Sequence, residues 1–413
     1  MPKPMNVLVL MCDHHRPDAL GCMGNDLVHT PNLDRLAGQS VWFDRCYTQA
    51  PVCSPARHSL ATGRHAHAHG VITNGHMPFP GMVTIAHALQ PLGYRRFNLG
   101  QMHWKDPDVD TGYEPWIRNQ TWHDAMPEEV LRRAEWESQG ITRRTTGGPS
   151  PRGKEQFTGH FLAQNAIRQI EEAVHSDEPF LCWTAFSEPH PPFYPPREIY
   201  AAIDQGRIAL PVQAPEGSPL PHDCILTKQK EWAHLTETEI RQILAGYYGM
   251  VSLVDGYCGM VLDTLDRLGI ADNTIVIWTS DHGDQMWEHR LFTKFCMYEG
   301  SVHVPLSIRI PGTPSDRRDE LVQHIDVFPT ICDLLGADAP GEVQGSSLLP
   351  LLDGGPTPDG WRDTVFSQIG DIQMIRKASH KLNVYGGAPG ELYDLQNDPD
   401  EFRNLIDEAD HRD

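Results

Sequence analysis

The stretch Asn6-Val-Leu-Val-Leu-Met-Cys-Asp13-His14 places a run of apolar residues directly before a carboxylate and an imidazole. A continuous apolar run, rather than an alternating one, is typical of a strand that is buried on both faces of a sheet. Far along the chain, Thr274-Ile-Val-Ile-Trp-Thr-Ser-Asp281-His282 repeats the arrangement. If these two strands are neighbours, two carboxylates and two imidazoles converge at one edge of the sheet and would form a divalent metal site. The alternative is that each aspartate caps a turn or the next helix.

Strand-like and helix-like segments alternate over the first three quarters of the chain. Helix starts are indicated by Thr30-Pro31, by Ser54-Pro55 and by the capping box that runs from Thr236 to Glu239. We therefore expect an α/β fold, a large mostly parallel sheet sandwiched by helices, in a catalytic domain over residues 1–354. Short strand-like runs separated by turns follow Gly354, and they predict a small C-terminal antiparallel β subdomain at 355–413.

Composition excludes several classes of protein. The net charge of −21 over 413 residues argues against a nucleic-acid or anionic-membrane partner, since both require a basic face. No segment has the length of a membrane span, and the first apolar run is too short for a signal peptide. Nine cysteines without a CxxC pair indicate a reduced, cytoplasmic protein. An anionic substrate would have to be attracted by local cations or by a metal.

The most specific segment is Pro51-Val-Cys-Ser-Pro-Ala-Arg-His-Ser-Leu-Ala-Thr-Gly63. Ser54 and Pro55 predict that a helix begins immediately after Cys53, so this side chain faces the positive end of a helix. Arg57 lies one turn further on and is expected to reach both Cys53 and a bound oxyanion. The alternative for a single cysteine is a thiol packed in the core.

Here the chain resembles the type I sulfatases of the alkaline phosphatase superfamily, close to arylsulfatases and phosphonate monoester hydrolases. Cys53-Ser-Pro-Ala-Arg57 matches their C-x-P-x-R signature, in which the cysteine is oxidised to formylglycine, the nucleophile. The resemblance spans almost the whole chain. Further matching fragments, in family order, are Asn6 to Asp13, Ala19 to Asn25, Thr30 to Asp34, Gly63 to Gly70, Thr73 to Gly75, Ser280 to Asp284, Val304 to Leu306, Asp326 to Thr330 and Glu391 to Leu395.

The resemblance also implies a ligand set for one divalent metal ion. Asp13 and Asp281 match family ligands, and the oxidised Cys53 supplies a ligand oxygen. His14 occupies a ligand position that more usually holds Asp or Gln, and His282 stands where the family has Asn, Gln or His. The expected ion is manganese or calcium, with zinc as a further alternative. Two histidines favour manganese or zinc, because calcium prefers oxygen ligands.

Other residues acquire roles only through the resemblance. His190, in Ser187-Glu-Pro-His190, and Lys294 match residues that neutralise or protonate the leaving oxygen. His103 matches the histidine that removes the last hydroxyl proton, and Asn74 matches a substrate-binding position. Gln101, also expected to bind substrate, replaces the lysine of the family's G-K-x-H motif. The trio His65, His67 and His69 is expected to be structural.

The resemblance implies hydrolysis of a small anionic sulfate ester after maturation by a formylglycine-generating enzyme. A phosphonate monoester or phosphodiester hydrolase that uses the same site is the first alternative, and an inert protein that binds sulfated ligands is the second. A tryptophan-rich insert over residues 105–153 suggests an apolar or aromatic leaving group, although carbohydrates also stack on tryptophan. A homo-oligomer is an open alternative.

Overall fold

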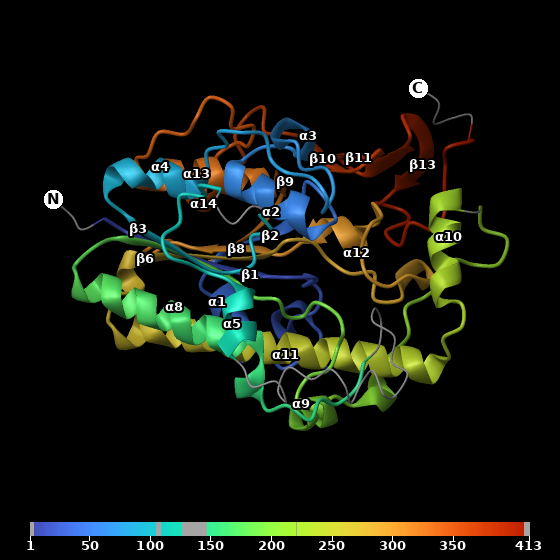
Figure 1. Ribbon diagram of the computed structural model, residues 1–413. Helices are drawn as coiled ribbons and strands as arrows, with labels where there is room; N and C mark the ends of the chain where they lie inside the picture. The colour runs from blue at the N-terminus through green and yellow to red at the C-terminus, as the bar shows by residue number, and fades with distance from the viewer. Residues whose placement is uncertain (1–3, 105–108, 126–146, 220, 409–413) are drawn as a thin grey trace.

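A mixed sheet of nine strands lies between two layers of helices, and a four-stranded antiparallel sheet follows it in the chain (Figure 1). The computed structural model describes residues 4–104, 109–125, 147–219 and 221–408. The large sheet has the order β4-β3-β5-β1-β6-β8-β2-β7, with β9 paired to β2. Its strands are β1 (Asn6–Cys12), β2 (Val41–Tyr47), β3 (Arg95–Gly100), β4 (Trp116–Ile117), β5 (Phe180–Ala185), β6 (Thr274–Ser280), β7 (His303–Val304), β8 (Leu306–Arg309) and β9 (Asp316–Gln323).

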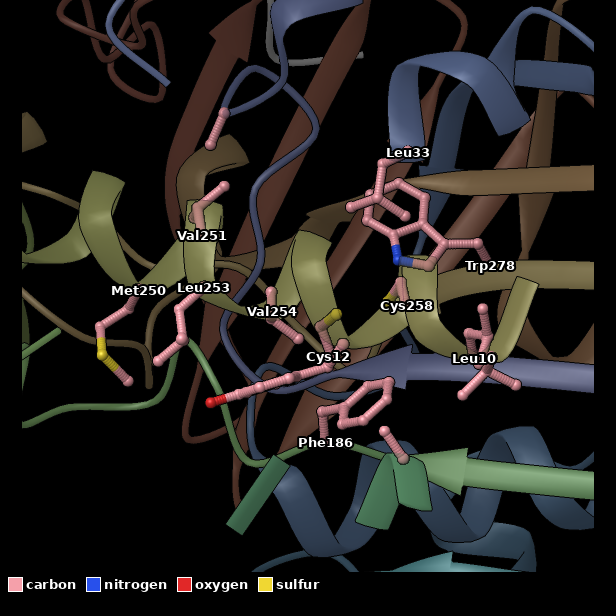
Figure 2. Packing of buried hydrophobic residues seen from close by; sticks show 14 of the residues in the cluster. Leu10, Cys12, Leu33, Phe186, Met250, Val251, Leu253, Val254, Cys258 and Trp278 are labelled. Carbon is pink, nitrogen blue, oxygen red and sulfur yellow. The ribbon is translucent and has the colours of Figure 1, made fainter. Parts of the chain in front are cut away.

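The central strand β1 is buried on both faces, as its apolar run predicts. Alternate residues enter different cores: Leu8, Leu10 and Cys12 belong to the cluster around α11, whereas Val9 and Met11 belong to the cluster on the opposite face. Figure 2 shows the first cluster, in which Leu10 and Cys12 face side chains of the long helix α11 (Glu237–Arg267). Each fully buried aliphatic side chain contributes about 1.5–3 kcal/mol, so the two cores fix β1 and its register.

Helices cover both faces of the sheet. In Figure 1, α8 (Thr158–His175), α11 and α1 (Pro31–Ala37) lie on one side, and α2 (Cys53–Thr62), α4 (Ile85–Leu89), α13 (Val327–Leu335) and α14 (Leu349–Leu352) lie on the other. The other α-helices of the described residues are α3 (Ala66–His69), α5 (Asn119–Ala125), α9 (Arg197–Ala202), α10 (Asp223–Trp232) and α12 (Glu299–Val302). Thr236 caps α11 in the expected capping box with Glu239. Among the described residues, no helix combines the length and the apolar character needed to cross a bilayer.

Parallel pairing brings distant parts of the chain together at one sheet edge. β1 pairs in parallel with both β5 and β6, and Cys12 lies opposite Ser280. The strands expected to be neighbours are therefore neighbours, and the α/β class is confirmed. The sheet also has antiparallel pairs: β6 pairs with β8, and β2 pairs with β7 and β8.

The C-terminal sheet consists of β10 (Thr364–Ile369), β11 (Ile372–Lys377), β12 (His380–Tyr385) and β13 (Ala388–Asp394), in that order. Its buried Glu391 accepts four hydrogen bonds. Two come from within the sheet, from Asn383 Nδ2 (3.1 Å) and the Tyr385 hydroxyl (2.7 Å). The other two come from the first 354 residues, from the His222 amide (2.9 Å) and the Tyr298 hydroxyl (3.0 Å). The boundary at residue 354 stays a prediction, and Glu391 links the segments on either side of it.

We predict that Glu391→Ala destabilises the protein by about 3 kcal/mol or more. The substitution leaves three buried donors and the partly buried His222 amide without an acceptor, and each buried donor costs about 1–3 kcal/mol. Urea denaturation measures the change in the free energy of unfolding. The matched control is Glu342→Ala at an exposed position, which should shift that free energy by less than about 0.5 kcal/mol. Equal stability of the two variants would contradict the assigned role of Glu391.

Candidate active site

Two carboxylates meet at the carboxyl ends of β1 and β6. Because Cys12 and Ser280 are opposite each other in the parallel pair, Asp13 and Asp281 leave the sheet side by side. They are 1% and 0% exposed. Two adjacent buried carboxylates require a cation nearby. Burial disfavours the ionised form of each, and their mutual repulsion adds to that penalty.

The guanidinium of Arg57 supplies that cation. Its Nη2 donates to Asp13 Oδ2 and its Nε to Asp281 Oδ2, both at 2.8 Å, and its Nη1 donates to the carbonyl oxygen of Gln101. Burial alone would lower the pKa of Arg57, but Asp281 and Asp13 raise it above the ordinary value. Burial would likewise raise the pKa of Asp13, and Arg57 is the main group that lowers it. Arg57 thus bridges the two carboxylates, a contact that its position one turn after Cys53 does not predict.

Cys53 lies among the same groups. It is the first residue of α2, with Val52 as N-cap, so the helix begins at Cys53 and not after it. Its Sγ is 3.6 Å from Asp13 Oδ1, 3.2 Å from His282 Nε2 and 3.1 Å from Lys294 Nζ. Burial, and next the charge of Asp13, raise the pKa of the Cys53 thiol to about 12. The unmodified side chain is therefore a neutral thiol and a poor nucleophile at neutral pH.

Three imidazoles surround this cluster. The ring centroid of His14 lies 4.6 Å from that of His190 and 4.5 Å from that of His282. Burial lowers the pKa of His282 to about 4 and that of His14 well below its ordinary value, so both rings are neutral and can offer a nitrogen lone pair. Burial also lowers the pKa of His190, whose Nδ1 donates to the carbonyl oxygen of Pro191 (2.7 Å).

The donor atoms fit a divalent metal ion. Two groups have candidate ligand atoms within 4.8 Å of one another: Asp13, His14, Cys53 and His190 form one, and Asp13, Cys53, Asp281 and His282 form the other. All five residues predicted as ligands are therefore gathered here. Lys294 Nζ contacts both Cys53 Sγ and His14 Nε2, so an ammonium group already lies where these donors converge. Carboxylate oxygens and imidazole nitrogens are both ligands that a divalent metal ion accepts.

A cavity of about 990 Å³ opens onto this cluster. The predicted substrate-handling residues Asn74, Gln101, His103, His190 and Lys294 all line it. Aromatic and cationic side chains form more of its wall: Trp104, Trp116, Arg118, Lys228, Trp232, Phe292 and Phe295. A second cavity, of about 620 Å³, contains none of the predicted site residues.

Local backbone geometry places several of these side chains. Gly100 ends β3 with φ of +104°, and a Cβ there would lie 2.1 Å from the Ala185 carbonyl oxygen, so glycine is required just before Gln101. The Asn74 side chain accepts a hydrogen bond from the Ser54 amide (2.9 Å), at the first turn of α2. The strand ends and the start of α2 therefore aim their side chains at one point.

One residue of the site has no role in the sequence-based account. Asp284 is 0% exposed, and its Oδ2 lies 2.7 Å from His14 Nδ1. The sequence contains it in the Ser280-Asp-His-Gly-Asp284 motif, three residues after a predicted ligand, which is the signal that could have found it. His69 is buried against Ser59 (2.9 Å), as expected for a structural histidine. Most of the tryptophan-rich insert, including Trp136, lies outside the described residues.

Comparison with known proteins assigns the chain to a family. The sulfatase family model matches residues 5–337, and a model for the C-terminal part of N-sulphoglucosamine sulphohydrolase matches residues 287–413. The chain belongs to the sulfatase family, and it is a sulfuric ester hydrolase.

Individual relatives agree with this assignment. The choline-sulfatase of Rhizobium meliloti is 27% identical over 97% of this chain and 82% of the relative. Arylsulfatase K of Danio rerio is also 27% identical, over 97% of this chain and 80% of the relative. Among solved structures, the phosphonate monoester hydrolase of Agrobacterium radiobacter superposes with a TM-score of 0.81 at 27% identity, covering 98% of this chain and 92% of that one.

We predict that Arg57→Ala lowers the stability of metal-stripped protein by about 3–5 kcal/mol, because it leaves Asp13 and Asp281 buried without a counter-charge. Added metal should reduce the difference, since a divalent cation compensates the same carboxylates. Urea denaturation with and without chelator measures both effects. Arg35→Ala, which removes only exposed ion pairs with Asp263 and Asp266, is the control and should cost less than about 1 kcal/mol. A loss from Arg57→Ala as small as the control's would show that the bridge is dispensable.

Proposed function

We propose that the chain hydrolyses monoanionic sulfate esters through a formylglycine derived from Cys53. The observation that carries the proposal is the position of Cys53 at the first residue of α2, within 3.6 Å of Asp13, His282 and Lys294. A nucleophile there is surrounded by candidate metal ligands and by a cation that can compensate the charge of a sulfate group. The family match supports this chemistry for the whole site.

The proposed ligands are Asp13, His14, Cys53 as formylglycine, Asp281 and His282. A divalent metal bound by them would polarise the ester's oxygens, and the hydrated aldehyde would supply a hydroxyl nucleophile. We assign the proton of that hydroxyl to Asp281, whose carboxylate lies within 4.8 Å of Cys53 Sγ, while Arg57 lowers the pKa of Asp13. The net charge of −21 makes this local positive centre necessary, because the protein as a whole repels an anionic ester.

Residues that line the cavity would protonate the leaving group. His190 donates a hydrogen bond from Nδ1 to the carbonyl oxygen of Pro191. Its Nε2 is therefore the atom that remains for proton exchange. Burial would lower the pKa of Lys294, but the negative charges of Asp13 and Asp281 raise it above its ordinary value, so the side chain remains an ammonium. We assign both to the leaving oxygen, and we assign to His103 the removal of the second hydroxyl proton that reforms the aldehyde and releases sulfate.

Maturation requires access to a thiol that is 3% exposed in the folded protein. Every residue of α2 is buried, so the thiol cannot be presented without unfolding this helix. We therefore propose that a formylglycine-generating enzyme acts on the chain before α2 packs. Proposed partners are this enzyme and the small anionic ester.

A second candidate function is hydrolysis of phosphonate monoesters or phosphodiesters. The 0.81 TM-score to a phosphonate monoester hydrolase at 27% identity favours it, since such a site would need the same nucleophile and metal. Hydrolysis rates of sulfate, phosphonate monoester and phosphodiester substrates that share a 4-nitrophenyl leaving group would rank the two functions. Zero turnover of all three by modified, metal-loaded protein would instead favour a protein that only binds sulfated ligands.

We predict that Cys53→Ala lowers kcat by at least about a thousandfold, because the nucleophile and one metal ligand disappear together. Mass spectrometry of the peptide that contains residue 53 should show conversion of the thiol to an aldehyde in active protein. Cys258→Ala, at another buried cysteine, is the control and should retain activity. Full activity of Cys53→Ala would refute the mechanism.

We also predict that monoanionic esters are preferred over phosphate monoesters. Gln101 stands where the family has lysine, so the pocket holds one positive charge fewer. Phosphate monoesters are largely dianionic near neutral pH, and each missing cation costs more against two negative charges than against one. Gln101→Lys should therefore raise kcat/KM for a phosphate monoester relative to a sulfate ester.

The matched control is Gln120→Lys, which adds a lysine at an exposed position on the wall of the same cavity. It should change the ratio of the two kcat/KM values much less than Gln101→Lys does. A parent enzyme that prefers the phosphate monoester would falsify the idea.

A further inference from the structure

Asp284 is held in one orientation by the backbone. Its Oδ1 accepts hydrogen bonds from the amides of Met286 (3.0 Å) and Thr293 (2.8 Å), which leaves Oδ2 to contact His14 Nδ1 at 2.7 Å. Arg16 Nη1 also donates to the Asp284 carbonyl oxygen (3.0 Å), so both the main chain and the carboxylate are fixed. The side chains of His14 and Asp284 are 1% and 0% exposed, so water does not compete for this contact.

The contacts of His14 define its tautomer. Lys294 Nζ contacts His14 Nε2, and an ammonium group has hydrogen-bond donors only. Nε2 must therefore be the acceptor, and the single ring proton resides on Nδ1, where it is donated to Asp284. The Nε2 lone pair then faces the candidate metal centre. Asp13 Oδ1 lies 3.7 Å from Nε2, and the Lys294 ammonium, which contacts Nε2, also contacts Cys53 Sγ.

We propose that Asp284 is a positioning residue that holds His14 as a nitrogen ligand of the metal centre, and that this pair makes the centre prefer manganese or zinc over calcium. The inference rests on the proposed function, because it concerns the same centre. A carboxylate that accepts the second N–H of a ligand histidine fixes its tautomer and makes it a better donor. Calcium prefers all-oxygen shells, so a well-oriented imidazole at this position disfavours it.

The decisive variant is Asp284→Asn. The amide oxygen of asparagine can still accept from Met286 and Thr293, whereas its NH₂ group would donate to His14 Nδ1. The ring proton would then move to Nε2, and the lone pair that faces the centre would be lost. We expect the affinity of stripped protein for manganese and for zinc to fall about 10- to 100-fold, measured by chelator competition without any ester present.

A double-mutant cycle separates positioning from a general structural role. His14→Gln supplies an amide oxygen in place of the imidazole, so it should lower the ratio of zinc to calcium affinity at least about tenfold. If Asp284 acts through His14, Asp284→Asn should lower metal affinity no further in the His14→Gln background. Pulsed EPR of manganese-loaded protein should show one coupled nitrogen fewer in both single variants. Asp255→Asn, at a buried carboxylate that accepts from the Leu33 amide (2.8 Å), is the control and should leave affinity within about twofold.

Several outcomes would overturn the proposal: an unchanged affinity in folded Asp284→Asn, an equal loss in both backgrounds, or an unchanged zinc-to-calcium ratio in His14→Gln. If Asp284→Asn does not fold, the His14→Gln ratio alone decides. Because no substrate is used, these results are independent of the ester assays. Failure of every sulfate ester to react would overturn the proposed function and leave the metal result standing.

Discussion

A single guanidinium holds two buried carboxylates together at the edge of the sheet, and the rest of the site depends on this contact. Parallel pairing of β1 and β6 in matching register obliges Asp13 and Asp281 to face each other. Without a cation, burial and mutual repulsion would disfavour the charged form of this pair. Arg57 lies on the same short helix as Cys53, so the two ion pairs that fix the guanidinium also fix the helix start that carries the proposed nucleophile.

The features that follow from local sequence could be predicted. Continuous apolar runs identified β1 and β6, the Thr236 capping box located the start of α11, and short strand-like runs separated by turns indicated the four C-terminal strands. The predicted site residues also lie together, because strand ends and one helix start determine their positions. Their catalytic roles stay predictions.

The features that depend on long-range contacts could not be predicted. The sequence contains Asp284 but not its contact with His14, which is 270 residues away. The ion pairs of Arg57 with Asp13 and Asp281 could not be predicted either, because its position one helical turn on indicates Cys53, whereas the tertiary structure also brings two strand ends within reach. The position of the Lys294 side chain depends on backbone conformations that the pattern of side chains along the sequence does not determine.

The backbone segment that carries Lys294 shows how the C-terminal sheet supports the site. Six non-glycine residues between β6 and α12 have positive φ, from 43° to 77°: Met286, Trp287, His289, Arg290, Thr293 and Phe295. Each costs of order 1 kcal/mol or more, so the segment keeps this shape only if other contacts determine it. At its start, Met286 donates to Asp284; further along, Thr293 donates to the same carboxylate and Phe295 donates to the carbonyl oxygen of Pro51.

At its end, Glu299 accepts hydrogen bonds from Lys381 Nζ (3.0 Å) and Arg376 Nη1 (2.9 Å) of the C-terminal sheet. The strained segment is therefore tied at one end to the candidate metal centre and at the other to β11 and β12. Since Lys294 lies between these two anchors, the C-terminal sheet is part of the support that places its ammonium beside His14 and Cys53.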